Sequence, residues 1–224
     1  MLSEIFKLFW KTVERKDARR INSQTPPTEI EQFCDIQYID DGLWQHSLDV
    51  YSKSGKLSHR PVIIDIHGGG WMYGTKEINK NYCLVLAQND YVVVNINYRL
   101  APDFSVADQL RDCFFAFKWV STNIEKYGGD LNNVFVTGDS AGGFLAAYSA
   151  LLNSSEKLRK IFGVTESGLE FRACGLTSPV CFMNTHTFQD VYYSRVKGKE
   201  FSESTLRGFE NFDAVLNKGS MPPT

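Results

Sequence analysis

The part of this chain that most constrains its fold is the segment at residues 133–143, which reads NVFVTGDSAGG. Its apolar run at 134–136 is typical of a buried strand, and the alanine-rich stretch that follows predicts a helix. Between them, Gly138, Ser140 and Gly142 form a G-x-S-x-G pattern. In this strand–turn–helix context the pattern predicts a strained turn that exposes the serine hydroxyl above a sheet. We expect glycine at both flanks because a Cβ atom there would collide with the neighbouring strand or helix. Ser140 is therefore the candidate nucleophile.

A second glycine-rich turn follows another buried strand. The apolar run at 61–66 leads into His67, Gly68, Gly69, Gly70 and Trp71. Three consecutive glycines allow amide N–H groups to point into a cleft, where they can hold the oxyanion of a tetrahedral intermediate; one such donor is typically worth about 2.7–4 kcal/mol. The N–H of Ala141, at the start of the helix after the serine, is the other expected donor. By itself such a turn could be a plain loop, but its occurrence with the serine turn argues against that.

Three motifs in this order resemble the hormone-sensitive-lipase-like branch of the α/β-hydrolase esterases. They are HGGGW at 67–71, YRLAP at 98–102 and GDSAGG at 138–143, and the resemblance covers about residues 35–180. It implies an α/β fold with a mostly parallel, doubly wound sheet, and a serine carboxylesterase that acts on short acyl esters. Trp71, with GTK at 74–76 after it, is also similar to esterases of the feruloyl-esterase and arylformamidase type. The alcohol and acyl groups of the substrate therefore stay open.

The same resemblance assigns roles by position. It implies that Ser140 is the nucleophile, that Gly69, Gly70 and Ala141 are the oxyanion donors, and that His67 fixes the glycine turn and is not the base. Gly68, Trp71, Gly138, Asp139 and Gly142 complete these motifs. Asp139 stands next to the nucleophile on a tight turn, so we expect it to brace the turn. Arg99 is expected to brace a loop by donating to backbone carbonyls.

The catalytic base and acid are harder to place. The histidines are His46, His59, His67 and His186, and only the last follows Ser140, by 186 − 140 = 46 residues. In α/β-hydrolases the order is Ser, then Asp or Glu, then His, and the resemblance places the family histidine beyond two further strands. Asp190 could share a helix face with His186, but the order Ser–His–Asp runs against the pattern. We expect His186 to be a lid or surface residue, with the catalytic alternative left open.

Missing strands would explain the missing acid and base. In the family, a segment similar to MPPT at 221–224 usually leads into the strand whose end carries the acid. The expectation is therefore a C-terminally truncated chain, inactive or nearly so, with the last strands and helices, the acid and the histidine beyond Thr224. Three regions are expected: a cap helix and linker at 1–30, the hydrolase core at 31–178, and a lid or cap segment at 179–224.

The first residues predict an amphipathic helix. Apolar residues recur with helical spacing at positions 2, 5, 6, 9, 10 and 13, and a basic cluster follows at 15–20. The segment lacks a small-residue cleavage site and is too short to span a bilayer, so it predicts neither a signal peptide nor a membrane span. Packing over the acyl pocket as part of a cap is the favoured role, and attachment to a membrane surface is the alternative.

Strand and helix patterns alternate along the rest of the chain. A hairpin is expected from strands at 34–39 and 43–51, followed by strands at 61–66 and 91–97, helices near 77–88 and 107–127, the strand before Ser140 and a helix to about residue 152. This alternation argues for a mostly parallel sheet covered on both faces. In such sheets ligands bind at the carboxyl ends of strands, where both glycine-containing turns fall.

The composition limits the classes of partner that this chain is expected to bind. The formal net charge is −2, which makes no electrostatic case for nucleic acid or for an anionic membrane. The five cysteines are scattered and form no C-x-x-C pair, which favours reduced thiols and a cytoplasmic protein. The sequence contains no phosphate-binding loop motif, no H-E-x-x-H motif and no paired Cys/His spacing of the kind that binds a metal. We therefore expect no cofactor and no metal, and a small-molecule ester as the partner, with the oligomeric state open.

Two other functions fit the same residues. The chain could be a non-catalytic pseudo-esterase that keeps the acyl pocket as a binding module. It could also cleave amides or peptides, because amide hydrolysis uses the same nucleophile and oxyanion donors.

Overall fold

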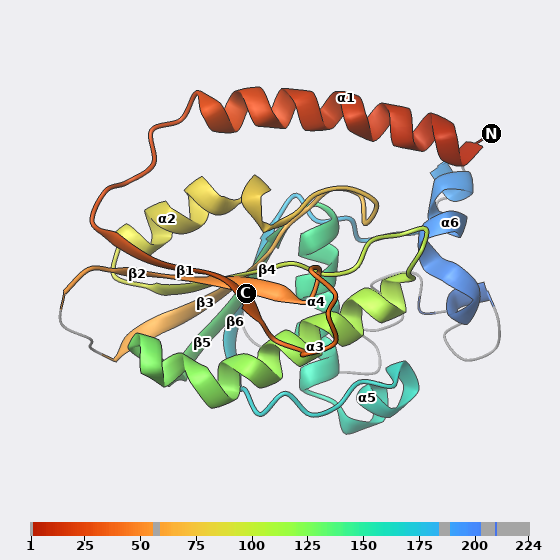
Figure 1. Ribbon diagram of the computed structural model, residues 1–224. Coiled ribbons are helices and arrows are strands. Elements are labelled where there is room, and N and C mark those ends of the chain that lie inside the picture. Colours follow the sequence, from red (N-terminus) through yellow and green to blue (C-terminus); the bar gives the residue numbers. More distant parts are fainter. Residues whose placement is uncertain (1, 56–58, 184–188, 203–208, 210–224) are drawn as a thin grey trace.

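The computed structural model describes residues 2–55, 59–183, 189–202 and 209. Within them, six strands form one sheet in the order β1-β2-β4-β3-β5-β6 (Figure 1). The strands are β1 (Ile30–Gln37), β2 (Ser47–Lys53), β3 (Arg60–Ile66), β4 (Val92–Ile96), β5 (Gly129–Asp139) and β6 (Phe171–Thr177). The pair β1–β2 and the pair β2–β4 are antiparallel, whereas β4–β3, β3–β5 and β5–β6 are parallel. The expected mostly parallel sheet is confirmed.

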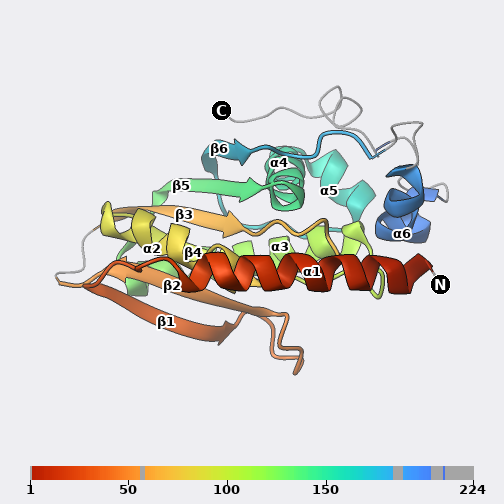
Figure 2. The same cartoon turned by 90° about the horizontal axis from the view of Figure 1, so that it is seen from above.

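Helices cover both faces of this sheet (Figure 2). They are α1 (Leu2–Asn22), α2 (Lys80–Gln88), α3 (Val106–Asn123), α4 (Ala141–Asn153), α5 (Glu156–Phe162) and α6 (Gln189–Ser202), with short 3₁₀ turns η1 (Lys76–Ile78) and η2 (Ile124–Tyr127). Alternation along β4 shows the two layers: Val92 and Val94 pack in the large core with α3 and α4, whereas Val93 packs with α2. Successive strand residues point to opposite faces, so the sheet is doubly wound as expected.

Local signals explain where two of the helices begin. The side chain of Ser105 accepts a hydrogen bond from the N–H of Asp108, whose carboxylate accepts from the N–H of Ser105, so a capping box starts α3. The Ser155 side chain caps α5 by accepting from the N–H of Leu158, and Gly163 ends that helix in the left-handed conformation. None of the described helices is both long enough and apolar enough to cross a membrane. All five cysteines are free.

The first hairpin differs from the prediction. Its strands pair at Ile30–Gln37 and Ser47–Lys53, joined by residues 38–46, instead of a tight turn at 40–42. The connection is closed by the Tyr38 N–H, which donates to the His46 carbonyl over 2.9 Å, and by the His46 ring, which contacts Asp41. These contacts hold residues 43–46 in a loop although their composition is compatible with a strand.

Candidate active site

Ser140 occupies the turn between β5 and α4. Its backbone has φ 51° and ψ −114°, a left-handed conformation that is strained for a residue with a side chain. The turn is held on both sides, because the Ser140 N–H donates to the Thr177 carbonyl (2.9 Å) and its carbonyl accepts from the Val180 N–H (3.1 Å). The side chain is half-buried, and its hydroxyl has no hydrogen-bond partner among the described residues. The serine is thus fixed in place with its Oγ available.

The flanking glycines are required by close backbone contacts. A Cβ atom on Gly142 would overlap the carbonyl oxygens of Ile66 and His67 at the end of β3. A Cβ atom on Gly138 would lie 2.5 Å from the Gly142 carbonyl carbon and 2.7 Å from the Ile66 carbonyl oxygen. The expected collision with both the neighbouring strand and the helix is therefore confirmed.

The glycine loop 67–70 lies directly beside this turn. Ile66 of β3 is in register with Gly138 of β5, so the two strands end at the same edge of the sheet. Gly69 and Gly70 adopt φ 112° and 57°, which glycine alone adopts without strain. Among the described residues, the backbone N–H groups of Gly69, Gly70 and Ala141 have no hydrogen-bond acceptor. Three donors are therefore available at the edge where Ser140 stands.

His67 is locked inside this loop. Its ring stacks on Tyr98 with centroids 4.4 Å apart, and its Nδ1 lies 2.7 Å from the Gly68 carbonyl oxygen. Burial lowers the pKa of His67 to about 4, against the opposing effect of the Gly68 hydrogen bond. The imidazole is therefore neutral at physiological pH, and it forms no hydrogen bond with Ser140.

A carboxylate–amide chain joins the two turns. Asp139 Oδ1 accepts from the Gly68 N–H and from Asn79 Nδ2, each over 2.9 Å. The same Asn79 amide group donates to Asp65 Oδ2 over 2.9 Å. Burial raises the pKa of Asp65 to about 7, with a further contribution from the charge of Asp139, although the hydrogen bond from Asn79 lowers it. The contacts of Asp139 are those of a residue that braces the turn.

Comparison with known proteins shows the family to which the chain belongs. The sequence profile of BD-FAE matches residues 48–187. The chain belongs to the BD-FAE family. Esterase B from Lactobacillus rhamnosis, solved with a tributyrin phosphonate, superposes with a TM-score of 0.92 at 31% identity, over 100% of this chain and 72% of the other. The resemblance to the hormone-sensitive-lipase-like α/β-hydrolase esterases is thereby confirmed.

Two relatives show what share of a longer protein this chain matches. The versiconal hemiacetal acetate esterase of Dothistroma septosporum is 36% identical over 112 residues, which are 50% of this chain and 33% of that one. The isoprenylcysteine alpha-carbonyl methylesterase of Arabidopsis thaliana is 28% identical over 189 residues, 80% of this chain and 44% of that one. The matched part of this chain thus spans less than half the length of each of these relatives.

Two helices far apart in the BD-FAE sequence contact the glycine loop. On α1, Trp10 stacks on Tyr73 with centroids 5.4 Å apart, and its ring lies where a Cβ atom on Gly70 would be. On α6, the Tyr192 hydroxyl donates to the Gly70 carbonyl, and its ring meets Phe6 of α1 edge-on at 5.0 Å. The assignment of α1 as part of a cap stays a prediction, but its inner face does contact the loop that would bind the oxyanion.

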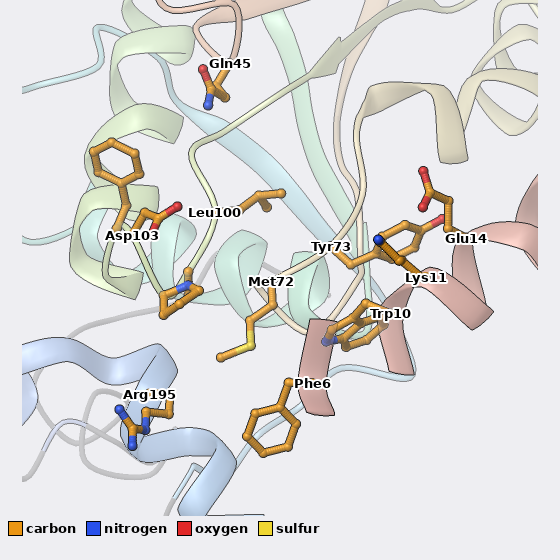
Figure 3. A pocket seen from close by; sticks show the side chains of 13 residues that line it. Phe6, Trp10, Lys11, Glu14, Gln45, Met72, Tyr73, Leu100, Asp103 and Arg195 are labelled. Carbon is orange, nitrogen blue, oxygen red and sulfur yellow. The ribbon is translucent and has the colours of Figure 1, made fainter. Parts of the chain in front are cut away.

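A cavity of about 420 Å³ opens beside these contacts (Figure 3). It lies between α1, α6, the end of the glycine loop and the loop at 100–104. Its wall is mostly apolar, with Phe6, Trp10, Met72, Tyr73, Leu100, Ala101, Pro102 and Phe104. Lys11, Glu14, Gln45, Asp103 and Arg195 add polar groups to its lining. Ser140 is not among the lining residues, whereas Met72 and Tyr73, which follow the glycine loop directly, are.

The partner of Arg99 differs from the prediction. Instead of loop carbonyls, its guanidinium binds the buried Asp112 of α3, with Nη2 2.6 Å from Oδ1 and Nε 2.9 Å from Oδ2. Nε2 of His46 approaches the same carboxylate at 3.2 Å, while its Nδ1 lies 2.7 Å from Asp41. A fully buried carboxylate is costly without a cation, so Asp112 draws both groups inward. The sequence carried no local signal for this cluster.

The described histidines do not supply a base for Ser140. His46 and His67 are held by the contacts above, and His59 precedes β3, at the strand end away from the site. His186 lies outside the described residues, and Asp190 is the second residue of α6. Among the described residues there is also no cluster of three His, Cys, Asp or Glu side chains able to hold a metal ion.

Proposed function

We propose that this chain is the nucleophile-bearing part of a carboxylic ester hydrolase. The observation that carries the proposal is the position of Ser140, in a left-handed turn next to a glycine loop. Ser140 Oγ attacks the ester carbonyl and loses its proton to a base, the tetrahedral intermediate releases the alcohol, and water then hydrolyses the acyl-serine.

The N–H groups of Gly69, Gly70 and Ala141 would stabilise the oxyanion. Their freedom from internal acceptors supports this role, because a donor already engaged elsewhere cannot bind developing charge. The neutral His67 would contribute no charge to this step, and its stacking on Tyr98 would keep the loop in one conformation. Electrostatic stabilisation here would therefore come from backbone dipoles.

The proposed substrate is an uncharged ester with a short acyl or aryl group. The apolar wall of the 420 Å³ cavity supports an apolar group beside the glycine loop. The tributyrin phosphonate bound by the structurally similar esterase B supports a short acyl chain. The base and its carboxylate would come from outside the described residues, since none of the described histidines forms a hydrogen bond with Ser140.

The test is covalent labelling by a fluorophosphonate, followed by intact mass measurement. We expect one adduct on the 224-residue chain after prolonged incubation, lost in Ser140→Ala. The incubation is long because a serine without a neighbouring base reacts slowly. Ser178 is a matched control, because it also follows a strand with a positive φ of 47° and is exposed. Ser178→Ala should label normally, and labelling that survives Ser140→Ala would overturn the proposal.

Turnover separates the remaining functions. A serine hydrolase without its base keeps at most about 10³–10⁴-fold acceleration over water, so only trace hydrolysis of p-nitrophenyl butyrate would mean that this chain does not supply the base. Full turnover that His186→Ala abolishes would assign His186 as the base. No label, with ester binding unchanged by Ser140→Ala, would instead indicate a pseudo-esterase. Faster cleavage of a matched p-nitroanilide would indicate an amide hydrolase.

A further inference from the structure

The outer face of α1 has no partner in the described structure. The helix lies along the outside of the molecule above α2 (Figure 1). Its inner face comprises Phe6, Trp10, Val13, Asp17 and Ile21, all partly buried. These positions follow one another at intervals of three or four, so they share one side of the helix. The opposite side begins at Leu8, whose surface is 68% exposed, and Phe9 beside it is 57% exposed.

The same outer side is cationic. Arg15 stands seven residues after Leu8 and Arg19 eleven residues after it, so the three side chains lie in one stripe along one side of the helix. At 1.5 Å per residue the distance along the helix from Leu8 to Arg19 is about 16 Å. Lys16 stands seven residues after Phe9 on the adjoining flank, also exposed. Arg15, Lys16 and Arg19 form no ion pair within the described residues. Although the whole chain has a net charge of −2, this side of α1 presents three exposed cations.

The described acidic residues of α1 are turned away from this stripe. Asp17 binds Arg20 (3.3 Å) and accepts from the Tyr73 hydroxyl (3.4 Å) on the inner side. Glu14 lines the 420 Å³ cavity. The outer side therefore combines exposed apolar side chains toward the beginning of the helix with unpaired cations further along.

We infer that this outer face binds the surface of an anionic lipid bilayer. A helix with Leu and Phe beside Lys and Arg suits an interface, because the apolar groups enter the boundary of the acyl chains while the cations meet lipid phosphates. A nucleic acid backbone would match the cations but would leave Leu8 and Phe9 in water. Binding in this way would place the cavity lined by Phe6 and Trp10 next to the lipid surface, with α1 as its wall.

Co-sedimentation of the full chain with phosphatidylcholine vesicles, with and without phosphatidylglycerol, tests the inference. We expect binding only with phosphatidylglycerol, weakened by salt. Leu8→Gln with Phe9→Gln should lower the partition coefficient at least tenfold. Arg15→Glu with Arg19→Glu should lower it about 25-fold or more, at roughly fivefold per cation removed. All four side chains are exposed, and the ring contact of Phe9 is with Trp10 of the same helix, with centroids 5.1 Å apart. Melting curves should therefore change little.

Two control variants test whether a loss of vesicle binding is specific to α1. Phe115→Gln removes an aromatic side chain that is 40% exposed on α3, away from α1. Lys126→Glu with Lys157→Glu changes the net charge as much as the arginine pair does, at exposed positions elsewhere. Equal losses in controls and α1 variants would overturn the inference. So would an absence of vesicle binding, or a dimer in sedimentation velocity that Leu8→Gln with Phe9→Gln dissociates. The assay does not involve Ser140, so its result is independent of hydrolysis.

Discussion

Removing Asp112 is the sharpest test of what holds the loop after β4 in place. The carboxylate is fully buried on α3 and meets the Arg99 guanidinium at 2.6 Å, the Arg99 N–H at 3.0 Å and His46 Nε2 at 3.2 Å. In Asp112→Ala the Arg99 side chain, only 17% exposed, keeps its contact with the Phe104 ring at 4.5 Å but loses its counter-ion. Breaking a buried pair by removing one partner costs about 3–5 kcal/mol.

The expected cost is measurable in two ways. Urea unfolding followed by tryptophan fluorescence should show the loss of about 3–5 kcal/mol. Thermal melts should shift down by about 6–20 °C, at roughly 2–4 °C per kcal/mol for a chain of this size. Glu156→Ala is the control, because its pair with Lys160 has the same 2.6 Å separation but lies in solvent. That control should not change the midpoint measurably.

The pH dependence of the same variant tests His46. Burial lowers the pKa of His46, but hydrogen bonds and charges of Asp112 and Asp41 outweigh it, so the pKa is raised above 6.5. A raised histidine pKa stabilises the fold fully below 6.5 and loses that effect as pH rises through the folded-state value. Asp112→Ala should therefore cost more at low pH than at high pH. A cost within error of the Glu156→Ala control at every pH would refute the reasoning.

Three further substitutions probe the site. Asp65 has a folded-state pKa of about 7, so the folded protein holds a proton that the unfolded chain has already lost. The free energy of unfolding of the wild type should therefore fall by about 3 kcal/mol between pH 5 and pH 8, and Asp65→Asn should remove this pH dependence. Asn79→Ala should cost about 1–3 kcal/mol in urea unfolding and slow fluorophosphonate labelling, since it removes the donor shared by Asp65 and Asp139. Gly142→Ala should abolish labelling and destabilise the fold, as its Cβ would overlap backbone oxygens; Gly175→Ala, whose nearest contact would be 3.1 Å, should label normally.

The sequence predicted the elements that local patterns define. The buried strands, the serine turn and the glycine loop all depend on residues within a dozen positions of one another. The ends of the first hairpin were wrong because the loop at 38–46 depends on distant atoms, such as the Asn97 carbonyl that accepts from the Tyr38 hydroxyl. Burial and hydrogen bonding of polar groups override β propensity there.

Other features depend on pairing across the fold. His46 and Asp112 are 66 residues apart, and Asn79 reaches Asp139 across 60 residues. No periodicity or motif marks such pairs. The aspartate at 65, polar within an apolar strand, was a visible sign of a buried hydrogen bond, but its partner could be found only in the folded structure.

The buried carboxyl of Asp65 also affects how enzyme kinetics on this fold would be interpreted. Its pKa of about 7 falls where an imidazole base is expected to titrate, and its hydrogen-bonded chain reaches the Gly68 N–H through Asn79 and Asp139. A change in the hydrolysis rate near neutral pH could therefore report the titration of either the Asp65 carboxyl or the imidazole base. Its temperature dependence separates them, because protonation of an imidazole releases far more heat than protonation of a carboxylate.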